Sequence, residues 1–356
     1  MSHSLSVEDS WEVLALDIGG GTQDLLLWSP DRTMENSIQC VLPSPTVMVA
    51  REIERITKQQ KPLFLQGHLM GGGASSKAVR RHLKAGLPVA AQTEAARTLH
   101  DNLEYVKALG VVISEDPPPG AASVIFSDIR EKTWRDFFEA FGLNQPRHFL
   151  VAVQDHGYSP VESNRKFRFD HWRAFLEREQ PLESLLLQEV PPYLTRMRAV
   201  QETWPQALVM DTGAAAILGA LEHEGLNGRP PAHCLVVNIG NEHTLAAWLV
   251  EGALKGVYEH HTFFLDREKL VAHLEAFVLG RISNRQIFED KGHGCLNLAP
   301  AQAFPPTLLV TGPRRAMLAG ARAVLAAPHG NMMLSGCFGL LRAFQGREGI
   351  RSKVKT

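Results

Sequence analysis

The sequence has 356 residues, enough for two or three domains with large hydrophobic cores. Its 37 basic and 38 acidic residues give a net charge of -1, so composition offers no reason to expect nucleic acid or an anionic membrane as partner. No apolar run approaches the roughly 20 residues that cross a bilayer, the N-terminus has no secretory pattern, and the four cysteines form no C-x-x-C pair. We therefore expect a reduced, cytoplasmic protein without a membrane partner.

The first fifty residues predict a three-stranded meander. EVLALDI, DLLLWS and NSIQCVL are apolar runs of strand length. The first turn, DIGGGTQD, contains three successive glycines, although a two-residue turn would reverse the chain.

Residues 45–154 then alternate between helical and strand patterns. Within them, FLQGHLMGGGASSK runs from a strand through Gly71, Gly72 and Gly73 into a helix, an arrangement that can bind an anion at the helix N-terminus. It lacks the Gly-Lys-Ser/Thr order of a P-loop, and a permissive loop explains the glycines equally well. As a functional site it would hold the phosphate or carboxylate of a substrate.

The polar, aromatic segment HGYSPVESNRKFRFDHWRAFLEREQ interrupts this alternation and predicts an insertion or lid near residues 155–200. Asp155 and His156 lie just past a strand end, where ligand groups are often found, and Arg165 follows in the same segment. Asp155 and His156 are therefore candidate substrate ligands, and Asn164, Arg165 and Arg168 could bind an anionic substrate. A solvated loop in which Asp155 forms a turn is the alternative.

The second half of the chain repeats the opening pattern. PQALVMDTGAAAILGALEH predicts a strand and a helix, and GLNGRPPAH marks a domain boundary near residue 230. HCLVVNIGNEHTLAAWLVEGALKGVYEH then reads as strand, glycine turn, strand, turn and strand, as at the N-terminus. PPTLLVTGPRRAMLAGARAVLA predicts a strand, a glycine turn and a helix.

The glycines of the first turn have a chemical use. Backbone N–H groups approach a phosphate closely only where no β-carbon intervenes, and several together form an anion site. Gly19, Gly20 and Gly21 with the Thr22 hydroxyl are therefore candidate phosphate ligands, and Asp17 could hold Mg²⁺ through water. A glycine-rich hairpin with an exposed aspartate is the alternative.

This ordered set of segments resembles the superfamily of actin, sugar kinases and heat-shock ATPases. The resemblance implies an α/β fold of two ribonuclease-H-like domains, residues 1–225 and 226–356, which close on ATP and Mg²⁺, with a C-terminal helix that can return to the first domain. By the same resemblance Gly240, Asn241 and Thr244 belong to a second phosphate segment, and Gly312 and Pro313 to an adenosine segment.

Two further roles come from this resemblance. Asn238 stands where the superfamily has a metal-site aspartate; its amide could hold a metal-bound water but adds no charge, which counts against rapid ATP hydrolysis. Asp211 occupies the position of the carbohydrate kinase general base, with Asp17 as the other candidate catalytic residue. An N-terminal helix cap is the simpler explanation for Asp211.

More narrowly, the chain resembles an uncharacterised prokaryotic family (DUF1786) whose members carry the label pyruvate formate-lyase activating enzyme. Such activases need three closely spaced cysteines for an iron–sulfur cluster, and this sequence has none so spaced. The expected function is ATP-dependent phosphoryl transfer to a small molecule. A nucleotide-dependent switch acting on a protein partner and a non-hydrolysing metabolite-binding protein are the alternatives.

The histidines receive no role from the sequence. His243 is expected to be a polar turn residue. DKGHGC, with His293 and Cys295, holds too few ligands for a metal, because a further ligand would have to come from elsewhere. The acceptor and the oligomeric state are not predicted.

Overall fold

The computed structural model describes residues 12–226, 231–299, 306–320 and 322–349. Its first sheet has the strand order β3-β2-β1-β8-β9: a meander in which β1, β2 and β3 are antiparallel, followed by β8 and β9, both parallel to β1. The strands are β1 Val13–Ile18, β2 Thr22–Trp28, β3 Ile38–Pro43, β8 His148–Val153 and β9 Leu208–Asp211.

The second sheet has the order β13-β12-β11-β10-β14-β15. Apart from the edge strand β13, it repeats the first: a three-stranded antiparallel meander and then two parallel strands. This order in both sheets is that of the ribonuclease-H-like fold, so the expected fold class is confirmed. The strands are β10 His233–Ile239, β11 His243–Val250, β12 Ala253–His261, β13 Gly294–Asn297, β14 Thr307–Thr311 and β15 Ala323–Leu325.

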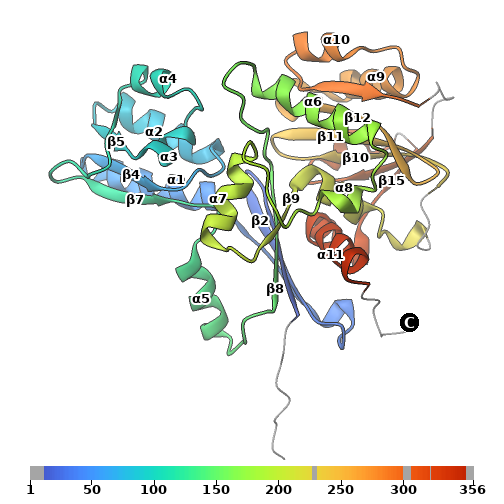
Figure 1. The fold of residues 1–356 in the computed structure, drawn as a ribbon, viewed down its shortest axis with the longest axis horizontal. Helices are drawn as coiled ribbons and strands as arrows, with labels where there is room; N and C mark the ends of the chain where they lie inside the picture. The colour runs from blue at the N-terminus through green and yellow to red at the C-terminus, as the bar shows by residue number, and fades with distance from the viewer. Residues whose placement is uncertain (1–11, 227–230, 300–305, 321, 350–356) are drawn as a thin grey trace, which may run out of the picture.

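Two helices lie between the sheets, α8 (Thr212–Ala220) and α11 (Ser335–Glu348). They cross with their backbones in contact, because a β-carbon on Gly219 would overlap the Ser335 carbonyl and one on Gly339 would overlap the Ala215 carbonyl. One hydrophobic cluster joins these helices to the inner faces of both sheets (Figure 1). The C-terminal helix also packs on β1, which brings it to the first glycine hairpin, formed by β1, β2 and the turn between them.

An unpredicted third sheet lies between β3 and β8 in the chain. Its four strands are parallel, in the order β6-β5-β4-β7, and with the helices around them they enclose a separate core (Figure 1, cyan). The sequence pattern predicts the helices of residues 45–58 and 73–84 and the strand of residues 63–67, but not the other three strands or their assembly into a separate unit. The single helix expected over residues 93–110 is wrong, since the structure has two short helices there. The elements are α1 Pro45–Lys58, β4 Leu63–Gly67, α2 Gly73–Lys84, β5 Val89–Ala91, α3 Thr93–Arg97, α4 Leu103–Ala108, β6 Val111–Ile113 and β7 Ala122–Phe126.

The segment expected to be a lid contains α6 (Asn164–Glu177) and α7 (Thr195–Thr203). Helix α6 packs against β12 and β13 of the second sheet, so it connects the two ribonuclease-H-like domains. The remaining α-helices are α5 Glu131–Ala140, α9 Arg267–Val278 and α10 Asn284–Glu289.

The prediction of a helix after Pro313 is wrong. Residues Arg315–Leu318 form one 3₁₀ turn, and Ala323–Leu325 is the edge strand β15. Gly320 ends the turn with a φ of +82°, a conformation that glycine adopts without the penalty a β-carbon brings. No helix in the described ranges is long and apolar enough to span a bilayer.

Candidate nucleotide and metal site

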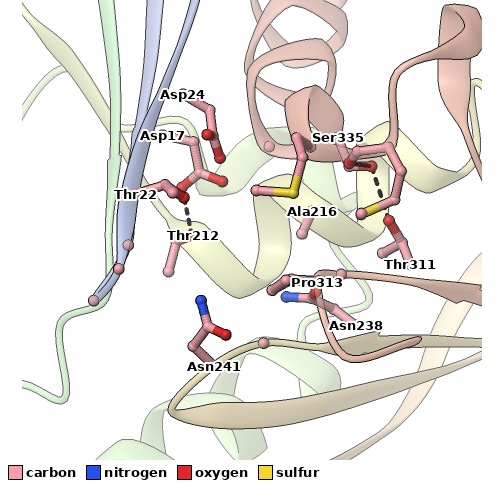
Figure 2. A pocket seen from close by; sticks show the side chains of 18 residues that line it. Asp17, Thr22, Asp24, Thr212, Ala216, Asn238, Asn241, Thr311, Pro313 and Ser335 are labelled. Atoms are coloured by element: carbon pink, nitrogen blue, oxygen red, sulfur yellow. Dashed lines mark hydrogen bonds between the residues drawn. The ribbon is translucent and has the colours of Figure 1, made fainter. Parts of the chain in front are cut away.

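The first glycine hairpin brings two carboxylates together. Gly19 N–H donates to the Thr22 carbonyl at 2.9 Å, and this tight turn pairs Asp17 directly with Asp24 across β1 and β2. Both line the cleft between the domains (Figure 2). Asp24 belongs to the DIGGGTQD motif but was not predicted as a site residue. The hairpin register was the signal that could have identified it.

The electrostatics of this pair favour a bound cation. Burial raises the pKa of Asp17 to about 7, partly offset by the Thr212 hydroxyl, which donates to Oδ1 at 2.5 Å. Burial and the neighbouring Asp17 raise the pKa of Asp24 to about 8. Asp24 Oδ1 is buried with no hydrogen-bond partner among the described residues. No lysine or arginine is among the described residues that line this part of the cleft, although Arg196 is close enough to lower the Asp17 pKa slightly. A divalent cation with oxygen ligands would supply the missing positive charge.

The C-terminal helix helps to position Asp17. A β-carbon on Gly336 of α11 would overlap the Asp17 carboxylate, so only glycine allows the helix to approach this closely. The two residues are far apart in the chain, and no sequence signal connects them.

The second hairpin faces the first across the cleft. Glu242 Cγ would lie 3.0 Å from a β-carbon on Gly20, and Asn241 Nδ2 would lie 3.1 Å from one on Gly21. Asn238, at the end of β10, lies across the cleft from Asp17 (Figure 2). The predicted nucleotide and metal residues lining this cleft are Asp17, Gly19, Gly20, Gly21, Thr22, Asn238, Gly240, Asn241, Gly312 and Pro313.

Thr244 is the exception among the predicted nucleotide ligands. Its side chain is fully buried, and its hydroxyl lies 3.0 Å from that of Thr262. It is therefore a packing residue behind the hairpin, since alternate residues of a strand face opposite ways.

Asp211 is engaged by other protein groups. Its Oδ1 accepts hydrogen bonds from Gly213 N at 2.9 Å and Ala214 N at 3.4 Å, which makes it the N-cap of α8. The buried Arg168 guanidinium also donates to both oxygens, at 2.8 and 3.2 Å, and to Glu259 Oε2 at 2.6 Å. Both oxygens of Asp211 are thus already engaged by protein donors, and the geometry matches the capping interpretation.

A second cavity of about 380 Å³ adjoins the cleft between the two glycine hairpins. It shares Gly19, Gly20 and Thr212 with the first hairpin and its surroundings. The predicted substrate residues that line it are Gly71, Gly72, Gly73, Asp155 and His156. The structure thus brings segments that are distant in sequence to one wall beside the phosphate hairpin.

The charged groups of this cavity differ from the prediction. Arg165 does not line it; its guanidinium donates to the Gly292 carbonyl at 2.7 Å and lies over the Phe288 ring. Asp155 lines the cavity, but its carboxylate accepts three backbone N–H groups. Arg196 of α7 lines the cavity and pairs with Asp128. It lies within the predicted lid but was not predicted as a site residue.

Comparison with known proteins gives one family and several remote structures. A family model described as "Putative pyruvate format-lyase activating enzyme (DUF1786)" matches residues 70–317. A search of curated proteins finds no significant match.

The similar solved structures share little sequence with the chain. A protein with actin-like ATPase fold and unknown function from Bacteroides thetaiotaomicron is 8% identical, with 97% of this chain and 99% of that one covered and a TM-score of 0.40. The ethanolamine utilization protein EutJ from Carboxydothermus hydrogenoformans is 10% identical, with 92% and 88% covered and a TM-score of 0.31. The ROK hexokinase from Thermus thermophilus is 10% identical, with 68% and 48% covered and a TM-score of 0.22.

TM-scores below 0.5 are too low to support an inference, so the fold assignment depends on the strand orders described above. The family match is different, because it spans more than half of the sequence. The chain belongs to the DUF1786 family.

Proposed function

We propose that this protein binds a magnesium nucleotide in the cleft between its two ribonuclease-H-like domains and transfers a phosphoryl group to a small molecule. The observation that carries the proposal is the meeting of the two glycine hairpins beside Asp17 and Asp24. Backbone N–H groups of both hairpins would bind the phosphates, and the aspartate pair would hold Mg²⁺.

The chain would act mainly by positioning and charge neutralisation, as phosphoryl transfer generally requires. Thr212 orients Asp17 through its hydroxyl, and Gly336 allows α11 to support the same carboxylate. Asn238 would contribute an amide oxygen without adding charge. The bound Mg²⁺ would neutralise charge on the transferred phosphoryl group.

The adjoining cavity is the proposed acceptor site. It reaches Gly19 and Gly20, so an acceptor held there would lie next to the terminal phosphate. Its volume of about 380 Å³ suits a small metabolite. Glu242 lines it beside Gly20 and is better placed than Asp211 to accept a proton from the acceptor.

The label of the family suggests a different reaction, which we do not propose. A radical activase needs three cysteines close enough to hold an iron–sulfur cluster. The four cysteines are free and come from different elements, and no metal-ligand group in the described part of the chain includes one.

Calorimetry with MgATP tests the proposal. Gly20→Val should abolish measurable binding, because the branched side chain would occupy the phosphate position. Gly346→Ala, on the exposed end of α11, is the matched control and should bind as wild type. ATP consumption is then screened against pools of hydroxylated and carboxylated metabolites.

The outcomes separate three functions. Equal binding by wild type and Gly20→Val would remove the hairpin from the site. If MgATP binds but no tested metabolite raises ATP consumption, a nucleotide-dependent switch is favoured. The close crossing of α8 and α11 provides an element that could transmit domain closure in such a switch. Absence of binding would leave a metabolite-binding protein.

A further inference from the structure

Four histidines from distant segments gather at one wall of the proposed acceptor cavity. His156 follows β8, His243 begins β11, His261 ends β12, and His293 precedes β13. The ring centroids of His156 and His293 are 4.8 Å apart, those of His243 and His293 4.9 Å, and those of His261 and His293 4.6 Å.

Three of these rings are arranged as metal ligands. One ring nitrogen from each of His156, His243 and His293 lies within 4.8 Å of the other two. Three imidazoles around one zinc ion, at Zn–N distances of about 2.0–2.1 Å, have nitrogens about 3.4 Å apart in tetrahedral geometry. Small rotations of the side chains would bring the three nitrogens to that spacing.

The ring nitrogens of these residues lack protein partners. His156 Nε2 and both nitrogens of His243 and His293 are buried without a hydrogen bond to any described residue. A buried polar group without a partner costs about 1–3 kcal/mol, and this cluster has five such atoms.

A second histidine group serves as contrast. His260, His273 and Asp290 also come close together, but their polar atoms are satisfied. His260 contacts the His261 carbonyl and Asp290, each at 3.0 Å, His273 contacts the Tyr258 hydroxyl at 3.0 Å, and Lys269 pairs with Asp290 at 2.5 Å. In that group, unlike the first, no ring nitrogen is buried without a partner among the described residues.

The first cluster lies beside charged groups of both signs: Arg168 with its carboxylate partners, and Arg165, whose guanidinium donates to the carbonyl of the adjoining Gly292. Arg168 is paired with both Asp211 and Glu259, so this buried triad carries one net negative charge. His293 is held by its backbone N–H, which donates to the Glu259 carbonyl at 3.0 Å.

We propose that His156, His243 and His293 bind one divalent transition-metal ion of the zinc class. Imidazole nitrogens are the ligands that zinc and its neighbours accept, and magnesium prefers oxygen. His156 and His243 line the cavity whereas His293 is 2% exposed, so the fourth coordination position faces the cavity. There it would receive water or an oxygen of a small anionic or hydroxylated substrate.

Zinc binding by the untagged full chain, after treatment with a chelator and its removal, tests this site. Competition with a chromogenic chelator should show one zinc per chain, and cobalt should give the visible absorption of a four-coordinate ion. His156→Gln and His293→Gln should each weaken zinc binding at least 100-fold. His273→Gln, in the satisfied group, should bind as wild type.

Each result has one meaning. Full-strength zinc binding by both ligand variants, loss of binding in His273→Gln, or no stoichiometric binding by wild type would overturn the proposal. Circular dichroism and the melting temperature identify any variant that fails to fold, and His243→Asn then replaces it. The measurement uses no nucleotide, so its result is independent of whether the protein binds MgATP.

Discussion

Binding of a magnesium nucleotide should release protons, because the two aspartates expected to hold the metal are partly protonated at neutral pH. With pKa values of about 7 for Asp17 and about 8 for Asp24, half of the first and about nine-tenths of the second carry a proton at pH 7. A protonated carboxyl group is a poor Mg²⁺ ligand. Binding at pH 7 should therefore release about 1.4 protons, and affinity should rise about 20-fold between pH 7 and pH 9.

Asp24→Asn is the informative perturbation. It removes the group with the higher pKa, so overall affinity should fall while the rise between pH 7 and pH 9 shrinks to about twofold. Asp116→Asn, at an exposed position outside the cleft, should retain the 20-fold rise. Calorimetry in buffers of different ionisation enthalpy, at saturating Mg²⁺, measures both affinity and proton release.

The same pKa values predict how the free energy of unfolding depends on pH. The folded protein holds these two protons more tightly than the unfolded chain, so without Mg²⁺ the free energy of unfolding should fall as pH rises through 7 and 8. Asp24→Asn should reduce that fall. A wild-type affinity that does not change between pH 7 and pH 9, or an Asp24→Asn variant with the full dependence, would refute the assignment of this pair to the metal.

Three further predictions concern neighbouring groups. Gly336→Ala should weaken MgATP binding at least tenfold in calorimetry, because the new β-carbon displaces the Asp17 carboxylate. Gly346→Ala in the same helix should bind as wild type. Equal affinities of the two variants would show that Gly336 does not position Asp17 for binding. Arg168→Met should lower the free energy of unfolding in urea by about 3–5 kcal/mol, since it leaves two buried carboxylates unpaired. Arg285→Met removes only an exposed ion pair and should leave the free energy of unfolding nearly unchanged; similar effects of the two variants would contradict the ion-pair interpretation. Asp211→Asn should keep the helix cap but weaken the hydrogen bonds to Arg168, which lowers the free energy of unfolding by about 1.5–3 kcal/mol. ATP turnover should stay within tenfold of wild type. A fall in turnover on the order of 10²–10⁴ in a folded variant would restore the general-base role.

The repeated ribonuclease-H-like architecture could be predicted from the sequence. Strand and turn patterns depend on residues close together in the chain. DIGGGTQD and NIGNEHT each predict a hairpin with glycine at the turn. The glycine turn itself pointed to Gly19 and Gly20, whereas the two similar domains and the cleft residues Gly240 and Gly312 followed from the resemblance of the ordered segments to the actin and sugar kinase superfamily. The parallel sheet of residues 63–126 was not predicted, because local periodicity does not say which strands pair.

The partners of individual side chains depended on the tertiary structure. Asp24 joins Asp17 through hairpin register, and Gly336 reaches Asp17 only because α11 returns across the molecule. Asp211 meets Arg168 across 43 residues, which turned a candidate base into a paired, capping carboxylate.

The histidine cluster makes the same point most clearly. From the sequence pattern, His243 was expected to be a turn residue, and the segment of His293 had too few ligands for a metal site. No local spacing connects residues 156, 243 and 293. Local backbone preferences act over a few residues, so they determine strands and turns. The burial, charge and ligand geometry of a site come from segments that only packing of the whole chain brings together.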